Sequence, residues 1–247
     1  MRFCSLGSGS RGNAHIVEKG NTTLLIECGF SHRTLKKRLL ERYLSPLEIN
    51  AVFVSHEHSD HVAGLKFFIE HNIPYYMSAG TARALAHPPN WRCLAAGEQV
   101  MVGELSIEAI PVAHDVSEPM QFIIEDGVRK LAIFTDLGHI SRNVLRACHD
   151  ADALMVECNY DDEMLARGNY PTHIKERIAG DYGHLSNSMA SQLIAATKRQ
   201  KPRHIIAAHI SAENNNETLV RRALKTADEN ATIHIASQSQ GTDWIQL

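Results

Sequence analysis

The chain has 247 residues, 44% of them hydrophobic, and a formal net charge of −3 with its histidines neutral. This length and composition favour one globular domain over residues 1–247 with a full apolar core. The near-neutral charge excludes a global basic field, so a nucleic-acid substrate would need a local basic patch.

The five cysteines are widely spaced, and none forms a Cys-x-x-Cys pair. This usage predicts buried thiols in a reducing compartment rather than a disulfide framework or a zinc knuckle. The N-terminus has no apolar signal core, and no apolar run is long enough to cross a membrane. We therefore expect a soluble, cytoplasmic protein with no membrane contact. A homo-oligomer is compatible with the sequence, which identifies no protein partner.

The first element in chain order is a strand at residues 1–6, followed by Gly7-Ser8-Gly9-Ser10-Arg11-Gly12. This run fits Gly-x-Gly-x-x-Gly, but a dinucleotide site would need a helix next. A hairpin pattern follows instead, with strands at 14–18 and 22–27 around Gly20-Asn21. The glycines therefore predict a tight turn near a site, whose exposed amides could meet an anion.

The rest of the chain alternates between helical and strand-like patterns. Helices are predicted at 31–44, 64–71, 81–86, 187–198 and 217–228. In the first of these, Leu35, Leu39 and Leu40 should share the buried face, and Asn187 should cap the fourth. Strands are predicted at 49–55, 75–77, 100–101, 105–110, 121–124, 130–134, 153–156, 204–208 and 232–236. Strands in both halves, with helices between them, favour two sheets packed face to face with helices outside.

The most informative stretch is His56-Glu57-His58-Ser59-Asp60-His61, directly after the strand at 49–55. Imidazole nitrogen suits zinc, iron or manganese, and carboxylate oxygen suits harder divalent ions. These groups could supply ligands to two neighbouring metals from one loop, which favours a two-metal hydrolase. The zinc-protease pattern His-Glu-x-x-His would need a histidine at position 60, and the preceding strand favours a loop over a helix. A polar loop with solvated histidines is the alternative.

Three more candidate ligands, His114, Asp136 and His209, each follow the carboxyl end of a predicted strand. The order His-x-His-x-Asp-His, His, Asp, His resembles the metallo-β-lactamase superfamily over about residues 7–215. The resemblance implies the α/β (α+β) class, as a four-layer αβ/βα sandwich of two mixed sheets flanked by helices.

The same resemblance implies a dinuclear site for two divalent metal ions, Zn²⁺ or Mn²⁺. His56, His58 and His114 would hold the first ion. Asp60, His61 and His209 would hold the second, and Asp136 would bridge them. Two ions roughly 3.5–4 Å apart can lower the pKa of a bridging water and stabilise the oxygens of a displacement. Taken alone, His114 would be a core histidine and Asp136 a turn residue, so the complete set carries the argument.

Several differences between this sequence and particular subfamilies narrow the expected function. Asp136 stands where many zinc β-lactamases have cysteine, which disfavours drug hydrolysis. Only 38 residues follow His209, which disfavours a glyoxalase II enzyme, because these enzymes add a helical domain after the last ligand. The gap from Asp136 to His209 is too short for a β-CASP domain, and that from His114 to Asp136 is too short for the ribonuclease Z arm.

A second motif resembles the nuclease branch of the superfamily. Gly183-His184-Leu185-Ser186-Asn187 is similar to the ribonuclease Z segment whose histidine protonates the leaving oxygen. The resemblance implies that His184 is a general acid, that Glu157 orients it, and that Asp60 belongs to the catalytic set as well as the metal set. The alternative for His184 is a loop residue beside a helix cap.

Finer features resemble the YycJ/WalJ-type branch, whose members are described as metal-dependent 5′→3′ DNA exonucleases. One departure is Glu27, where many superfamily members have aspartate; we expect it to support the histidine loop. The motifs that carry the likeness are Leu6-Gly7-Ser8-Gly9-Ser10-x-Gly12-Asn13, His114-Asp115, Glu118-Pro119, Glu157-Cys158-Asn159-Tyr160-Asp161, Tyr170-Pro171, His209-x-Ser211 and Asn214-Asn215.

The resulting prediction is a phosphodiesterase, foremost a DNA exonuclease, in which a metal-bound hydroxide attacks phosphorus. The alternatives are RNA or tRNA processing, hydrolysis of a small phosphodiester or thioester, and a metal-binding regulator without turnover.

Candidate substrate contacts complete the prediction. Arg11, Lys175 and Arg177 are the best candidates for phosphate contact. Tyr160, Tyr170 and Tyr182 could stack a terminal base, or pack in the core. Two basic stretches are interpreted as solvated helix faces: Lys36, Lys37, Arg38 and Arg42, and Arg221, Arg222 and Lys225.

Overall fold

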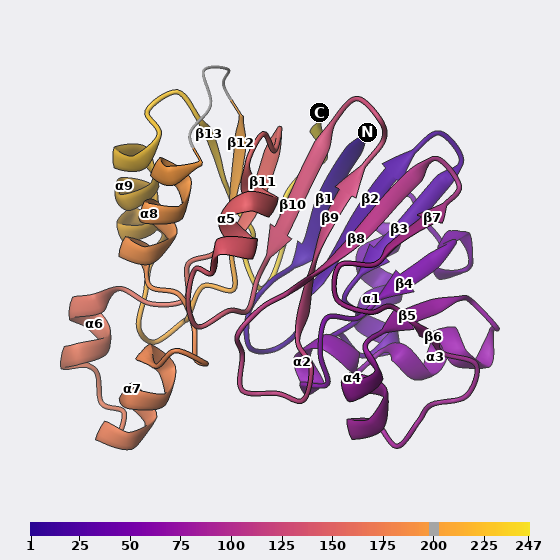
Figure 1. The fold of residues 1–247 in the computed structure, drawn as a ribbon, viewed down its shortest axis with the longest axis horizontal. Helices are drawn as coiled ribbons and strands as arrows, with labels where there is room; N and C mark the ends of the chain where they lie inside the picture. Colours follow the sequence, from indigo (N-terminus) through magenta and orange to yellow (C-terminus); the bar gives the residue numbers. More distant parts are fainter. Residues whose placement is uncertain (198–202) are drawn as a thin grey trace.

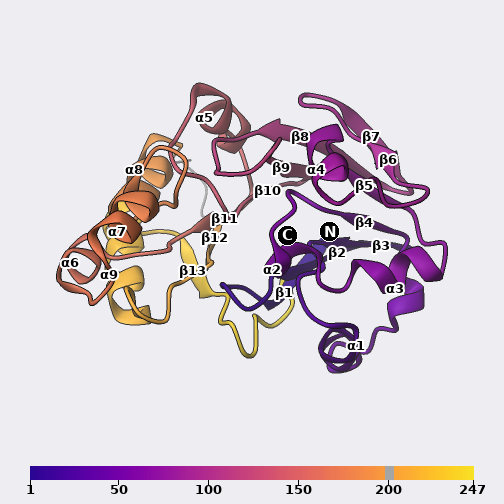
Figure 2. The ribbon, with the colours of Figure 1, turned by 90° about the horizontal axis from the view of Figure 1, so that it is seen from below.

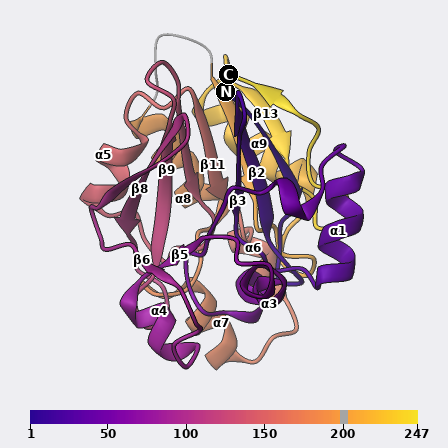
Figure 3. The same cartoon turned by 90° about the vertical axis from the view of Figure 1, so that its right-hand side faces the viewer.

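The structure is a computed structural model that describes residues 1–197 and 203–247. Within these residues, two seven-stranded sheets lie face to face, and helices cover their outer faces (Figure 1). Figure 2, a view from below, shows α8 and α9 on one side of the sheets and α1 and α3 on the other. The two chain ends meet at the end of the sandwich remote from α2 (Figures 1 and 3), where the Leu247 amide donates to the Met1 carbonyl.

The first sheet has the strand order β14-β1-β2-β3-β4-β5-β6. Strands β14, β1, β2 and β3 pair antiparallel, whereas β3 to β6 run parallel. The strands are β1 (Arg2–Gly7), β2 (Ala14–Lys19), β3 (Thr22–Ile26), β4 (Ala51–Phe53), β5 (Tyr75–Met77), β6 (Arg92–Cys93) and β14 (Ile245–Gln246).

The second sheet has the order β13-β12-β11-β10-β9-β8-β7. Here β7 to β10 pair antiparallel and β10 to β13 run parallel, so both sheets are mixed. The strands are β7 (Gln99–Val102), β8 (Leu105–Pro111), β9 (Met120–Glu125), β10 (Lys130–Phe134), β11 (Ala153–Glu157), β12 (His204–Ala208) and β13 (Thr232–Ile235).

Nine α-helices and one 3-10 turn, η1 (Pro46–Glu48), connect the described strands. On the side of the first sheet they are α1 (His32–Leu40), α2 (Ser59–Val62), α3 (Leu65–Glu70) and α4 (Ala79–Ala84). The others are α5 (Arg142–Cys148), α6 (Asp162–Arg167), α7 (Thr172–Ala179), α8 (Asn187–Ala196) and α9 (Glu217–Ala227). Among the described helices, none combines the length and the apolarity that crossing a bilayer requires.

The core has three layers, as expected for four layers of secondary structure. In β10, Leu131 and Ile133 point between the sheets, while Ala132 and Phe134 pack beneath the helices of the second sheet. This period of two is the property of a strand that is buried on both faces. A third apolar layer lies between the first sheet and helices such as α1 and α3. The predicted four-layer sandwich is confirmed.

Most predicted elements are present, but several details are wrong. Leu40 is 56% exposed because α1 ends there, so only Leu35 and Leu39 of the predicted face are buried. Cys93 is exposed, unlike the other four cysteines, which are buried.

Two helix boundaries also differ from the prediction. The cap of α8 is Ser186, whose hydroxyl accepts from the Met189 amide, and Asn187 is the first helical residue. The helix ends at Ala196, and the predicted end at Lys198 lies outside the described residues. The stretch after His58 is not wholly a loop, because Ser59–Val62 forms the short helix α2.

Asp126 joins the two sheets at the end remote from α2. Its carboxylate accepts from Lys19 Nζ (2.9 Å) on β2 and from the amides of Val128 (3.0 Å) and Arg129 (2.7 Å). Burial alone would raise the pKa of Asp126, but the bonds from Lys19 and the two amides hold it well below the usual range. A depressed pKa contributes stability above the ordinary carboxyl pKa of about 3.9, and that stability is lost as the pH falls.

We expect Asp126→Asn to lower the stability at pH 7 by about 1 kcal/mol, or roughly 2–4 °C in Tm, because a charge-assisted bond becomes a neutral one. The difference from wild type should shrink as the pH falls from 5 towards 2. Thermal melts across that pH range measure it. A constant difference at every pH would show that the ionised carboxylate contributes nothing.

Candidate metal and catalytic site

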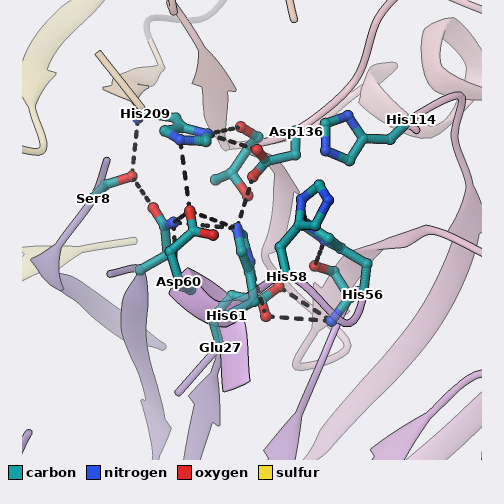
Figure 4. Close-up of polar contacts among 12 residues, drawn as sticks. Ser8, Glu27, His56, His58, Asp60, His61, His114, Asp136 and His209 are labelled. Atoms are coloured by element: carbon teal, nitrogen blue, oxygen red, sulfur yellow. Dashed lines mark hydrogen bonds and ion pairs between the residues drawn. The ribbon is translucent and has the colours of Figure 1, made fainter. Parts of the chain in front are cut away.

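The candidate residues come from the carboxyl ends of strands in both sheets. His56 and His58 follow β4, and Asp60 and His61 lie in α2. His114 follows β8, Asp136 follows β10 and His209 follows β12. Glu157 is the last residue of β11. Because parallel strands end at the same edge of a sheet, one site collects side chains that are distant in the sequence (Figure 4).

Three imidazoles form the first cluster. The ring nitrogens of His56, His58 and His114 offer one ligand atom each within 4.8 Å of one another. His114 donates from Nδ1 to the Gly183 carbonyl (3.0 Å), so Nε2 is the ring nitrogen that remains to bind a metal. Burial holds the pKa of His56 well below its usual value, and a neutral imidazole is the form that binds a metal.

The second cluster is centred on Asp136 (Figure 4). Its Oδ1 lies 2.6 Å from His209 Nδ1, and its Oδ2 lies 3.2 Å from His61 Nε2. His56, His61 and Asp136 also offer ligand atoms within 4.8 Å of one another, so Asp136 connects the two clusters. Asp60 is more peripheral, with Oδ2 3.5 Å from His61 Nε2 and 3.9 Å from His209 Nε2, and it belongs to none of the tightest groups among the described residues.

The charges of the second cluster favour a bound cation. Burial would lower the pKa of His209, but the Asp136 carboxylate raises it to about 9. Burial would likewise lower the pKa of His61, yet Asp136 and Glu27 hold it well above the usual value. Carboxylates that attract protons so strongly also attract a divalent ion.

Two buried atoms support the same reading. His114 Nε2 makes no hydrogen bond with any of the described residues, and Asp136 Oδ2 makes only the ion-pair contact with His61 among them. Buried polar atoms are almost always bonded in native proteins, so these two atoms, one in each cluster, indicate a missing ligand. The two clusters together offer five imidazoles and two carboxylates, a donor set that fits zinc or manganese.

His184 and Glu157 lie beside the second cluster. His184 Nδ1 donates to Glu157 Oε1 (2.7 Å), and Glu157 Oε2 accepts from the amides of Leu137 and Leu185 (3.1 Å each). Burial would lower the pKa of His184, but the charge of Glu157 outweighs it and raises the pKa. Three bonds fix the buried Glu157, so this carboxylate fixes the ring of His184 in turn.

Two non-glycine residues at the site adopt a left-handed backbone. These are Glu27 (φ 62°) and His209 (φ 50°). Both carboxylate oxygens of Glu27 accept from the Ser55 amide (3.2 and 3.3 Å), and Oε2 lies 3.2 Å from His61 Nδ1. The structure therefore places Glu27 beneath the histidine loop, as expected. A left-handed backbone is unfavourable for these side chains, so the surrounding contacts must hold it in place.

A family model described as a beta-lactamase superfamily domain matches residues 22–210 of this chain. The chain belongs to the beta-lactamase superfamily. Exodeoxyribonuclease YycJ of Bacillus anthracis is 32% identical over 91% of this chain and 88% of its own. Exodeoxyribonuclease WalJ of Streptococcus pneumoniae is 27% identical over 91% and 87%. Among solved structures, the metallo-β-lactamase fold protein YhfI of Bacillus subtilis aligns with a TM-score of 0.77 at 18% identity, over 99% and 98% of the two chains. The protein is accordingly a metal-dependent hydrolase.

The glycine-rich loop of this superfamily member is wrongly predicted as an anion site. The amides of Gly9, Arg11 and Gly12 bond to Asn13 Oδ1, Gln238 Oε1 and the Gly9 carbonyl. The loop instead packs against the histidine motif. A Cβ at Gly29, the residue paired with Asn13, would lie 1.5 Å from the Asp60 carbonyl, so only glycine allows this approach.

Asn13, which the sequence did not single out as a site residue, connects this loop to the second cluster. Its Nδ2 donates to Asp60 Oδ2 (3.2 Å) and lies 3.2 Å from His61 Nε2. Its Oδ1 accepts from Ser8 Oγ (2.8 Å), which itself accepts from the His209 amide (2.9 Å; Figure 4). Asn13 therefore orients the carboxylate that is otherwise least fixed.

We expect Asn13→Ala to weaken divalent-metal affinity by roughly 10- to 100-fold, the usual effect of losing a partner of a metal ligand. Gln238→Ala is the matched control, because Gln238 bonds to the same loop but to no candidate ligand. Chelator competition with Zn²⁺ or Mn²⁺ measures the affinities, and circular dichroism verifies folding. Equal losses in both variants would assign the effect to the loop rather than to Asp60.

The predicted basic faces are only partly solvated. Arg38 donates to the carbonyls of Leu6 and Gln238, and Arg42 donates to those of Gln240 and Thr242. These two arginines join α1 to the loop before β14. Lys225 similarly donates to the carbonyls of residues 229 and 231. The solvated interpretation is therefore wrong for Arg38 and Arg42, whereas Lys225 remains exposed as predicted.

The candidates for substrate contact differ in their exposure and in their bonding partners. Tyr160 is 4% exposed, so of its two predicted roles core packing is confirmed and base stacking is wrong, whereas Tyr182 is 63% exposed. Lys175 donates to the Ala166 carbonyl, and Arg11 is exposed. Arg177 pairs with Asp115, a residue the sequence did not assign to the site.

Proposed function

We propose that residues 1–247 act as one domain that hydrolyses phosphodiester bonds of DNA from the 5′ end. The pair of His184 and Glu157 beside the metal cluster carries this proposal. A phosphodiester expels an alkoxide, which needs a proton, and a histidine held by a buried carboxylate can donate one. The exodeoxyribonuclease names of the two relatives, each aligned over most of this chain, support DNA as the substrate.

We assign the metal ligands as the resemblance implies. His56, His58 and His114 would hold one ion; Asp60, His61 and His209 would hold the other, and Asp136 would contact both. Two Zn²⁺ or Mn²⁺ ions would activate a water for attack and neutralise charge on the phosphoryl oxygens.

The remaining residues act through position and proton transfer. With its Nδ1 bonded to Glu157, His184 has Nε2 available for the leaving oxygen. Glu157 keeps that tautomer and orientation, because two backbone amides fix the carboxylate itself. Asp60, oriented by Asn13, completes the catalytic set.

The state of the cysteines indicates the kind of cellular compartment in which the protein acts. All five are free thiols, and four are buried. Free thiols are typical of a reducing compartment, which supports a cytoplasmic location for the protein.

The test uses protein reconstituted with Zn²⁺ or Mn²⁺ and duplex DNA, single-stranded DNA and RNA, each labelled at the 5′ or the 3′ end. We expect mononucleotides to be released stepwise from the 5′ end of DNA. Cleavage of RNA alone would favour RNA processing instead. No cleavage of any nucleic acid would contradict the nuclease assignment and leave small phosphodiesters and thioesters to be tested.

A further inference from the structure

Tyr182 is an exposed aromatic residue on a backbone that is fixed beside the candidate site. On one side of it, the Asp181 carbonyl accepts from His139 Nδ1 (3.0 Å); on the other, the Gly183 carbonyl accepts from His114 Nδ1 (3.0 Å). The ring itself remains 63% exposed. An exposed phenol ring next to a candidate ligand and two positions before His184 needs an explanation other than core packing.

Close packing against Gly138 fixes this placement further. A Cβ at Gly138 would lie 2.2 Å from the Asp181 carbonyl oxygen and 2.6 Å from the Gly183 amide. The segment around Tyr182 therefore lies directly against the loop that follows Asp136. Gly138 also donates to the Ala113 carbonyl (2.7 Å), next to His114. The backbone of Tyr182 is thus held between the loops that supply two of the candidate ligands.

Arg177, in the last turn of α7, provides a cation on the same segment. Its Nε lies 2.6 Å from Asp115 Oδ2, and its side chain is 62% exposed. Asp115 Oδ1 lies 3.6 Å from His114 Nε2 and 4.0 Å from His58 Nε2. The ion pair therefore places the guanidinium at the margin of the first histidine cluster, where a substrate phosphate could reach it.

Helix α7 itself contributes nothing to the core. None of its eight residues, all within the described part of the chain, is buried. Figure 1 shows α7 beyond the ends of the strands, at the end of the molecule where α2 lies. A helix that packs so little, and that leads directly to His184 through the bond from the His184 amide to the Ile178 carbonyl, is well placed to contact substrate.

We propose that Tyr182 and Arg177 form a binding surface for a single nucleic-acid strand. The Tyr182 ring stacks on the unpaired base nearest the scissile phosphodiester, and Arg177 contacts an adjoining phosphate. The substrate class is therefore a polynucleotide with an unpaired end, rather than a small phosphodiester without a base. This inference rests on the proposed function and specifies which part of the strand the site recognises.

A double-mutant cycle between Tyr182 and the base tests the stacking contact. Wild type, Tyr182→Ala and Tyr182→Phe are compared on single-stranded DNA with either a normal or an abasic terminal nucleotide. We expect Tyr182→Ala to raise KM about 10- to 100-fold on normal DNA with little change in kcat, and Tyr182→Phe to retain the wild-type KM. On abasic DNA the wild type and Tyr182→Ala should have the same KM. Equal effects of Tyr182→Ala on both substrates would overturn the proposal.

Tyr43→Ala is the matched control, because Tyr43 is 95% exposed at the end of α1 and should leave every KM unchanged. A similar loss in Tyr43→Ala would also overturn the stacking contact.

The salt dependence of binding tests Arg177. With His184→Ala protein and a fluorescent single strand, Arg177→Ala should lower the slope of log K against log salt concentration by about 0.7, the value for one lost phosphate contact. An unchanged slope would overturn the phosphate contact. Absence of DNA cleavage by the wild type would instead refute the proposed function, so the two failures are distinct.

Discussion

Replacing His184 with alanine should lower kcat on DNA by about 10²- to 10⁴-fold, the usual contribution of a positioned general acid. The bound metal should stay unchanged, because His184 is not among the proposed ligands. The reason is the chemistry of the leaving group. A nucleoside alkoxide is a poor leaving group unless it is protonated, and the Glu157 carboxylate, 2.7 Å from His184 Nδ1, holds the ring that supplies the proton.

A substrate with a good leaving group separates this role from a structural one. On a p-nitrophenyl phosphodiester the expelled phenolate needs no proton, so His184→Ala should lose far less activity than on DNA. Metal content by mass spectrometry and thermal melts verify that the site and fold are intact. His149→Ala, which changes an exposed histidine on the C-terminal side of α5, serves as the control. Equal losses on both substrates would contradict a proton-donor role.

The positions of the candidate ligands could be predicted because they depend on strand ends. His114, Asp136 and His209 each follow a strand that the apolar pattern identifies, and parallel strands deliver their carboxyl ends to one edge. The fold follows from the same pattern, since strands buried on both faces need covering layers. The order of these residues then resembles the ligand set of the superfamily, and that resemblance assigned them to one site.

The contacts that orient those ligands could not be predicted in this way. Asn13 reaches Asp60 across 47 positions, and Arg177 reaches Asp115 across 62. Such pairs depend on rotamers and on loops that meet only in the folded chain. The glycine loop illustrates the point, because Gln238, from the far end of the sequence, takes up the Arg11 amide that could otherwise have bound an anion.

Short, exposed helices also escaped prediction. Helix α7 has no buried residue within its described span, and α6 buries only Leu165. Both helices are short and bury at most one residue, so each leaves only a weak helical signal in the sequence. Arg177 and Tyr182 could therefore be named as candidates from residue type, but the helix that places Arg177 could not be predicted.

Removal of metal should lower the thermal stability of the protein substantially. Ions that bind only the folded chain stabilise it by about 4 kcal/mol when present at 1,000 times their Kd. For a chain of this size that is roughly 8–16 °C in Tm. The ligands come from four strand ends and α2, so only the folded chain brings them together. Melts with Zn²⁺ or Mn²⁺, and after treatment with EDTA, measure the difference.

Asp136→Asn should remove most of the rise in Tm that metal produces, and it should abolish hydrolysis. The change keeps the size of the side chain but removes the charge that lies between His61 and His209. Asp126→Asn is the matched control, since it lowers the starting Tm at the opposite end of the sandwich and should retain the full increment. Metal analysis should find two ions per wild-type chain. The opposite outcome is one ion per chain and a metal-dependent rise in Tm that persists in Asp136→Asn. It would contradict a dinuclear site and indicate a single ion on His56, His58 and His114.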